Sequence, residues 1–244
     1  MKPAAFFFST FGICAALVFA AAEPPKVVSI SPAFWAVGVN PGSQRTVSIT
    51  FNEPMVPGFT AWLGRSSLAP PEVDLNSTVS QDRKTFEMKV GLQPGKVYVF
   101  ALNEKGIPGV GFQNDKGSSL PPTFLVFQTS GNIAAQDAPP KIVRSMPPHG
   151  AAVDAARLTS ISITFDKPMN RQKHGLHIFE NNNPVDLSKA QFSYSTDGAT
   201  FTLPYNFKRG TQYRLELNNI HDIGFSSANR IPLWPAQIAF ATAP

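Results

Sequence analysis

The sequence has few of the residues that most often perform chemistry in proteins. Its 244 residues include one cysteine and four histidines, and only 15% are Asp, Glu, Lys or Arg, against about 25% in an average soluble domain. The single cysteine, Cys14, lies in an apolar segment at the N-terminus. If that segment is removed, the rest of the chain forms no disulfide, and cysteine nucleophiles and cysteine metal sites are excluded.

Clusters of one charge are also missing. The net charge is +5, but lysine and arginine are scattered singly or in pairs such as Arg83–Lys84 and Lys208–Arg209. A nucleic-acid-binding surface requires basic residues gathered on one face. We therefore expect no nucleic-acid partner.

The only long apolar run is at the N-terminus. Lys2 precedes the apolar residues 4–19, and three small residues, Ala20 to Ala22, follow them before Glu23. This order is typical of a secretory signal peptide with its cleavage site. The run is shorter than the about 20 residues that cross a membrane as a helix. The sequence predicts a cleaved signal peptide at residues 1–22, export to the periplasm or the cell surface, and no transmembrane anchor in the mature chain.

The mature chain contains the same segment pattern twice, in the same order and at a near-constant spacing. The matched segments are residues 24–28 with 139–143, 48–51 with 162–165, 54–55 with 168–169, 85–86 with 200–201, 95–103 with 210–218 and 127–129 with 240–242. A repeat of this length indicates a duplicated domain rather than a solenoid unit. The pattern predicts domain 1 at residues 23–130, a linker at 131–137 and domain 2 at 138–244.

Within each copy, apolar residues alternate with polar ones. Val47, Ile49 and Phe51 alternate with Thr and Ser, and residues 160–165 repeat the alternation. This period of two predicts strands with one buried face. Similar short rows recur between clusters of Pro, Gly, Asn and Asp. The pattern predicts an all-β fold of two tandem immunoglobulin-like β-sandwich domains.

Two motifs recur in both copies, and we interpret both as structural. In Phe-x-x-Pro-Met, the proline ends strand pairing because it lacks an N–H, and the methionine fills the end of the core. In Gly-x-x-Tyr, the tyrosine resembles a tyrosine corner, in which its hydroxyl binds upstream backbone. The positions concerned are Phe51, Pro54, Met55, Tyr98, Phe165, Pro168, Met169 and Tyr213.

Together these motifs resemble the bacterial Ig-like domain found in S-layer proteins of the SbsA type. The resemblance runs over nearly the whole mature chain, twice. It implies a β-sandwich used as a spacer, surface or adhesion module, with no shared catalytic residues and no cofactor. A weaker similarity to small periplasmic copper carriers rests on Ser-x-Pro and Phe-x-x-Pro. Those carriers bind copper through an N-terminal histidine, whereas the expected mature start here is Glu23-Pro24-Pro25.

Two groups of residues are candidates for binding. His174, His177 and His221 are candidate metal ligands, although zinc requires three or four ligands and a strand would turn residues 174 and 177 to opposite faces. Exposed tryptophans could stack on sugars, although tryptophan is more often buried; the three are Trp35, Trp62 and Trp234.

We expect a non-catalytic exported protein that contacts an unidentified protein or envelope component. The alternatives are a protein that binds a carbohydrate or small ligand through exposed aromatics and, less favoured, a metal-binding protein.

Overall fold

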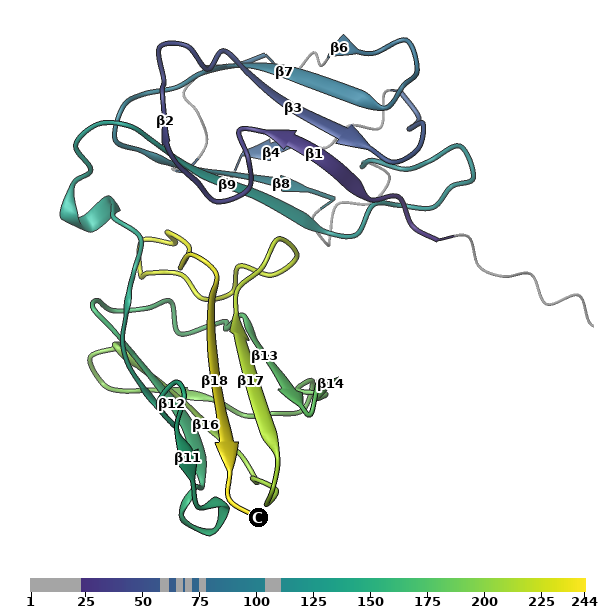
Figure 1. Ribbon diagram of the computed structural model, residues 1–244. Coiled ribbons are helices and arrows are strands. Elements are labelled where there is room, and N and C mark those ends of the chain that lie inside the picture. The colour runs from purple at the N-terminus through teal and green to yellow at the C-terminus, as the bar shows by residue number, and fades with distance from the viewer. Residues whose placement is uncertain (1–22, 58–61, 65–67, 69–71, 75–77, 104–110) are drawn as a thin grey trace, which may run out of the picture.

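The chain folds into two β-sandwiches, one formed by each copy of the repeat (Figure 1). The computed structural model describes residues 23–57, 62–64, 68, 72–74, 78–103 and 111–244. The expected signal peptide lies outside the described residues. No helix in this described part is long and apolar enough to cross a membrane.

Domain 1 contains two antiparallel-rich sheets packed face to face. One sheet has the order β1-β3-β7-β5, with β6 also paired to β7, and the other has the order β2-β9-β8-β4. The strands are β1 (Val27–Ser31), β2 (Ala36–Val39), β3 (Thr46–Phe51), β4 (Trp62–Gly64), β5 (Glu72–Val73), β6 (Thr78–Val79), β7 (Thr85–Gly91), β8 (Val97–Leu102) and β9 (Thr123–Thr129).

Domain 2 repeats this arrangement after the short 3-10 turn η2 (Ala135–Asp137). Its sheets have the orders β10-β12-β16-β15 and β11-β18-β17-β13-β14. The elements are β10 (Ile142–Met146), β11 (Ala152–Val153), η3 (Ala155–Arg157), β12 (Ser160–Phe165), β13 (Leu176–Glu180), β14 (Asn183–Pro184), β15 (Ser193–Tyr194), β16 (Thr200–Pro204), β17 (Gln212–Leu217) and β18 (Ala236–Thr242).

The alternation in the sequence places the two cores. Strands β3 and β12 both alternate between half-buried and buried residues, so the predicted inward rows are confirmed. Each first strand pairs with the equivalent neighbour and carries an irregularity at the same point, next to Val28 in domain 1 and Val143 in domain 2. The duplication therefore extends to strand pairing and to this local defect.

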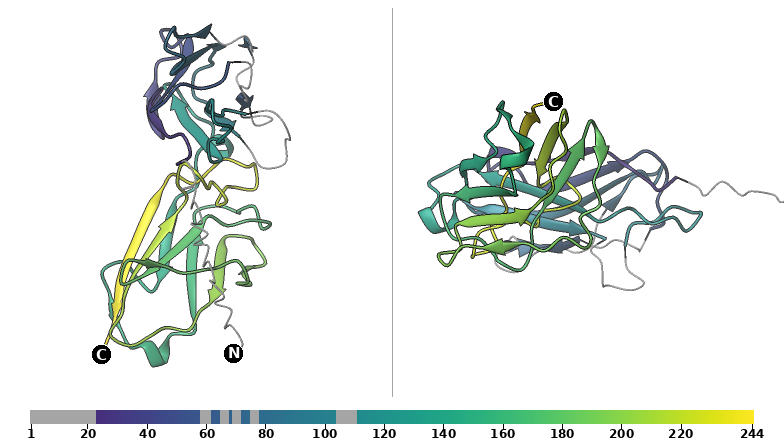
Figure 2. Two further views of the ribbon diagram at one scale, coloured as in Figure 1. Left: turned by 90° about the vertical axis from the view of Figure 1, so that its right-hand side faces the viewer. Right: turned by 90° about the horizontal axis from the view of Figure 1, so that it is seen from below.

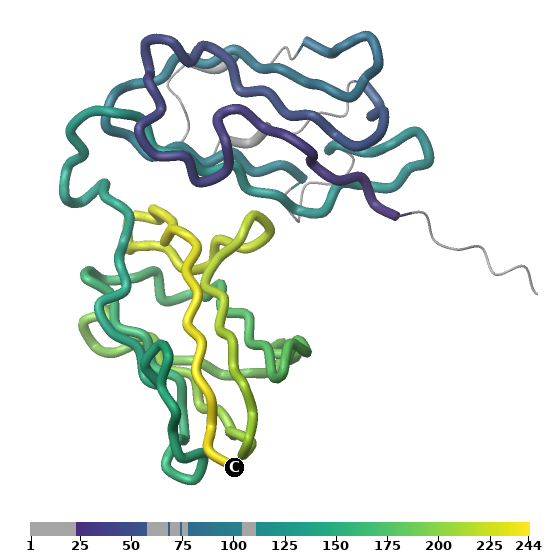
Figure 3. Tube along the Cα trace, in the orientation of Figure 1, coloured from purple at the N-terminus to yellow at the C-terminus, as the bar shows by residue number. Residues whose placement is uncertain are grey.

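Domain 1 lies across one end of domain 2. The loops that join the strands of domain 2 at this end reach the sheet of domain 1 that contains β8 and β9, while the C-terminus lies at the opposite end of domain 2 (Figures 1 and 3). The side view shows the same end-to-side arrangement (Figure 2). One end of domain 2 and one sheet face of domain 1 thus form an interface.

Candidate functional site between the two domains

Strands β8 and β9 of domain 1 are apolar on both faces. Tyr98 and Phe100 point into the core of domain 1, but Val97, Val99 and Ala101, which alternate with them, are also buried. These outward residues belong to a separate cluster that includes side chains of domain 2. Its members are Leu68, Val97, Val99, Ala101, Phe124, Val126 and Ile231, with Trp35, Ile133, Ile223 and Trp234 packed against them.

Two of the candidate tryptophans meet in this cluster. The rings of Trp35 and Trp234 make an edge-to-face contact with centroids 5.5 Å apart, and the indole Nε1–H of Trp234 donates a hydrogen bond to the Trp35 carbonyl at 3.0 Å. Both side chains are half-buried. The structure therefore places these rings against each other between the domains rather than side by side as an open platform.

Trp35 adopts an unusual backbone conformation at this contact. Its φ angle is 60°, a region that bulky side chains rarely adopt. Its N–H donates to the Val126 carbonyl at 2.6 Å, and in domain 2 the equivalent bond joins the Gly150 N–H to the Ala239 carbonyl at 2.7 Å. Gly150 has a φ angle of 78°. A tryptophan thus stands in domain 1 where domain 2 has a glycine suited to this conformation.

Polar contacts fix the loop that follows β17 onto domain 1. The Phe124 N–H donates to the Ile220 carbonyl at 2.6 Å. The His221 ring approaches the Pro122 carbonyl with its Nδ1 at 2.8 Å. Because a carbonyl can only accept, Nδ1 carries a proton in this contact.

The linker is held by both domains. Lys96 of domain 1 forms an ion pair of 3.1 Å with Asp137, and the Asn229 side chain of domain 2 donates to the Gln136 carbonyl at 3.2 Å. The ammonium of Lys167 binds the carbonyls of residues 135 and 138 at 2.9 and 2.8 Å. These contacts order the short connection between the sandwiches.

The three candidate metal ligands do not converge. His174 packs its ring against Phe192 and Phe201, and burial lowers its pKa although the nearby Asp222 carboxylate opposes that shift. His177 lies on β13 with its Nε2 3.2 Å from Asp222, whereas His221 faces domain 1. Among the described residues, no group of three or more His, Cys, Asp or Glu side chains could hold a metal ion.

The aromatic residues and methionines of the motifs are buried in the two cores, whereas the prolines are not. In each Phe-x-x-Pro-Met block the phenylalanine is the last residue of a strand, β3 or β12, and the proline and the methionine come after that strand. The buried members are Phe51, Met55, Tyr98, Phe165, Met169 and Tyr213, while Pro54 is half-buried and Pro168 is exposed. The Tyr98 hydroxyl accepts the Gln93 N–H at 2.8 Å, and the Tyr213 hydroxyl accepts the Lys208 N–H at 2.7 Å. Both tyrosines therefore have the geometry of a tyrosine corner.

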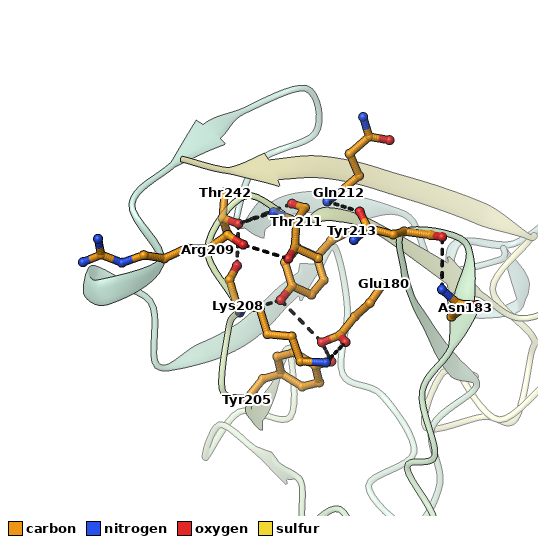
Figure 4. A network of polar contacts seen from close by, with 10 residues as sticks. Glu180, Asn183, Tyr205, Lys208, Arg209, Thr211, Gln212, Tyr213 and Thr242 are labelled. Atoms are coloured by element: carbon orange, nitrogen blue, oxygen red, sulfur yellow. Dashed lines mark hydrogen bonds and ion pairs between the residues drawn. The ribbon is translucent and has the colours of Figure 1, made fainter. Parts of the chain in front are cut away.

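Domain 2 adds a carboxylate to its corner (Figure 4). Glu180 accepts hydrogen bonds from the hydroxyls of Tyr205 at 2.7 Å and Tyr213 at 3.4 Å, and it pairs with the ammonium of Lys208. Burial opposes ionisation of this carboxyl, but the bonds from Lys208 and Tyr205 outweigh it, so the pKa of Glu180 lies below its ordinary value. This network lies at the end of domain 2 away from the interface.

The model of one family, the bacterial Ig-like domain, matches the chain twice, at residues 21–128 and 136–242. The chain belongs to the bacterial Ig-like domain family. None of the curated protein sequences matches it.

Solved structures that resemble this tandem of bacterial Ig-like domains do so distantly. CopC from Methylosinus trichosporium OB3b is 11% identical with a TM-score of 0.34, over 43% of this chain and 94% of its own. The S-layer protein fragment rSbsC(31-844) is 12% identical with a TM-score of 0.31, over 90% of this chain and 26% of its own. The titin fragment I67-I69 is 13% identical with a TM-score of 0.28, over 91% and 66%.

Sequence reasoning missed the outward residues of β8 and β9. Their signal is nevertheless present. Residues 97–102 read VYVFAL, apolar at every position, whereas the equivalent strand of domain 2 reads QYRLEL, with polar residues at alternate positions. A strand without a polar face indicates burial on both sides. Trp62 lies on β4, but its side chain is outside the described part of the structure.

Proposed function

We propose that this protein is a non-catalytic module of the bacterial cell envelope, of the kind used in S-layer proteins, that is exported and acts by contact with a protein or envelope component. The observation that carries this proposal is the apolar interface that fixes one Ig-like domain across the end of the other. In this proposal residues 1–22 direct export.

A fixed interface gives such a module a mechanical use. Domains joined by a flexible linker move independently unless their interface is large and hydrophobic. Here Val99, Ala101 and Val126 of domain 1 are fully buried, and Ile231 and Trp234 of domain 2 pack in the same cluster. The two sandwiches therefore hold their loops and strand edges in one relative position, which favours a spacer or a binding surface spread over both domains.

The histidines support a structural rather than a catalytic role. The His149 ring accepts the Ala239 N–H at 3.1 Å. His174 packs in an aromatic cluster, His177 lies against Asp222, and His221 contacts the Pro122 carbonyl. The rings of His149, His174 and His221 thus contribute contacts to the fold or the interface, while the Nε2 of His177 approaches Asp222 without forming a hydrogen bond.

A pull-down tests the proposal. Purified protein is incubated with fractionated envelope from the source organism, separated into peptidoglycan, outer membrane and soluble proteins. We expect saturable retention on one fraction. Retention on none, or turnover of a substrate by the purified protein, would overturn the proposal.

A matched variant tests the role of the fixed geometry. Trp234→Ala weakens the interface, whereas Val37→Ala changes a side chain that is 65% exposed. If the partner contacts both domains, Trp234→Ala reduces retention and Val37→Ala does not. Equal retention of the two variants would assign binding to one domain alone and would contradict the idea that partner binding requires the fixed interface.

A further inference from the structure

A cleft of about 550 Å³ opens beside the linker, between the two domains. Small-molecule sites commonly have volumes of about 300–1,000 Å³ and form preferentially at domain interfaces. The cleft is lined by Leu68, Lys96, Val97, Asp137, Ala228, Asn229, Arg230 and Ile231. Half of these residues are apolar and half are polar or charged.

The apolar wall and the charges of the cleft have distinct origins. Leu68, Val97 and Ile231 are buried members of the interdomain cluster, with 9%, 4% and 2% of each exposed, so the interface fixes the apolar wall and leaves only its edge, mainly Leu68, facing the cleft. Lys96 and Asp137 neutralise each other in their ion pair. No hydrogen bond or ion pair of the Arg230 guanidinium is seen among the described residues, and this side chain is exposed. One positive charge therefore remains for a ligand.

The position of Arg230 is unusual for an arginine. Its φ angle is 66°, in the left-handed region that glycine adopts without strain. The hairpin is closed by the Arg230 N–H to the Ser227 carbonyl at 2.7 Å and by the Ser227 N–H to the Ile231 carbonyl at 2.8 Å.

The same hairpin in domain 1 provides an internal comparison. There the Gly117 N–H donates to the Asn114 carbonyl at 3.0 Å, the Asn114 N–H donates to the Ser118 carbonyl at 3.0 Å, and Gly117 has a φ angle of 79°. Domain 2 thus has an arginine at the position where domain 1 has a glycine, which adopts this conformation without strain. The reverse exchange occurs at Arg83 and Gly198, where the Arg83 guanidinium binds Asp115 of its own domain. Arg230 has no such partner among the described residues, and strained residues occur at functional sites.

The hairpin that carries Arg230 is also held in place. The Ala228 N–H donates to the Pro168 carbonyl at 2.9 Å, and the Asn229 side chain binds the Gln136 carbonyl of the linker. The backbone that carries the guanidinium is therefore already ordered, and only the freedom of the Arg230 side chain itself is lost when a ligand binds.

We propose that this cleft binds a small monocarboxylate, whose carboxylate is held by Arg230 and whose body lies between the exposed Asn229 and the edge of Leu68. A guanidinium binds one carboxylate through two parallel hydrogen bonds. The single unpaired cation of the cleft matches a ligand with one negative charge. This ligand role is independent of the envelope role proposed above.

Calorimetric titration of the purified protein with 3-phenylpropionate and with hexanoate tests the site. The neutral amides of the same acids are the ligand controls. We expect saturable binding of an acid and at least about tenfold weaker binding of its amide, the size expected for loss of a charge-assisted hydrogen bond. Amide shifts in an NMR titration should be confined to residues 96–97 and 228–231.

Two substitutions of the arginine separate binding from folding. Arg230→Gln removes the charge, and Arg230→Gly also gives the hairpin the residue found in domain 1, so its thermal midpoint should not fall. Both should weaken acid binding about tenfold or more. Arg209→Gln changes an exposed arginine at the opposite end of domain 2 (Figure 4) and should leave the affinity for the acid unchanged.

Three results would overturn the proposal. These are no saturable binding of either acid at millimolar concentration, equal binding of acid and amide, and Arg230→Gln binding that equals wild type. Retention on an envelope fraction is a separate measurement. Absence of acid binding would therefore not contradict the envelope proposal, and absence of envelope retention would not contradict the cleft proposal.

Discussion

Trp234→Ala should uncouple the two domains. The substitution removes an edge-to-face ring contact with Trp35 and the hydrogen bond from its Nε1–H to the Trp35 carbonyl. Truncating a fully buried tryptophan costs about 3–5 kcal/mol. Trp234 is only half-buried, so the ring accounts for roughly 2 kcal/mol, and the lost hydrogen bond raises the total to about 2–3 kcal/mol.

Scanning calorimetry measures this loss. For a chain of this size, each kcal/mol moves the midpoint by about 2–4 °C, so the unfolding of the less stable domain should begin about 4–12 °C lower. Trp234→Phe keeps an aromatic ring but loses the indole N–H donor, so we expect the free energy of unfolding to fall by about 1 kcal/mol. Val37→Ala is the surface control. An unchanged calorimetric trace for Trp234→Ala would refute the idea that this contact couples the domains.

Three further predictions concern the domains separately. Phe165→Ala removes a side chain that is 3% exposed and should destabilise domain 2 by about 3–5 kcal/mol in thermal unfolding. Isolated residues 23–133 should bind a dye for apolar surfaces and self-associate, because the outward face of β8 and β9 is uncovered. Isolated residues 138–244, which uncover only Ile223, Ile231 and Trp234 of the same cluster, should bind less of the dye. The folded-state pKa of Glu180 is depressed, so its stabilisation is complete above the ordinary glutamate pKa of about 4.3 and is lost as the pH falls through the lower folded value. Glu180→Gln should flatten this acid-side loss in a pH series of denaturant titrations, and an unchanged pH profile would contradict the role of the Lys208 and Tyr205 contacts.

The two-sandwich fold could be predicted because its signals are local and occur twice. Alternation in strands such as residues 46–51, the Phe-x-x-Pro-Met block and the tyrosine motif each depend on a few neighbouring residues. The interface could not be placed in the same way, because it joins Trp35 to Trp234 across most of the chain. The sequence identified both residues as candidates, and only the folded structure shows that they are partners.

The arrangement of the candidate metal ligands also could not be predicted from the sequence. The spacing of His174 and His177 gives no information on which loop of the sandwich lies beside them. The structure brings Asp222 to His177 and turns the adjacent His221 toward domain 1. Neighbouring residues in one loop therefore serve different surfaces, and this depends on the loop path rather than on residue type.

The duplication itself identifies where the two copies have taken different roles. At three equivalent positions of left-handed backbone, one copy has glycine and the other a bulky residue: Gly150 against Trp35, Gly117 against Arg230, and Gly198 against Arg83. Each bulky residue carries a backbone cost of roughly 1–2 kcal/mol that glycine avoids. Two of the bulky residues lie at the junction of the domains, Trp35 in the apolar interface and Arg230 in the cleft beside it. The third, Arg83, forms an ion pair with Asp115 of its own domain. The glycines in the other copy show that the fold does not require a side chain at these positions. Arg83 has a partner in its own sandwich, whereas Trp35 contacts Trp234 of the other domain and Arg230 lines the cleft between the domains. The junction is therefore where these exchanges serve something other than the stability of a single sandwich, and it is where function should be sought first.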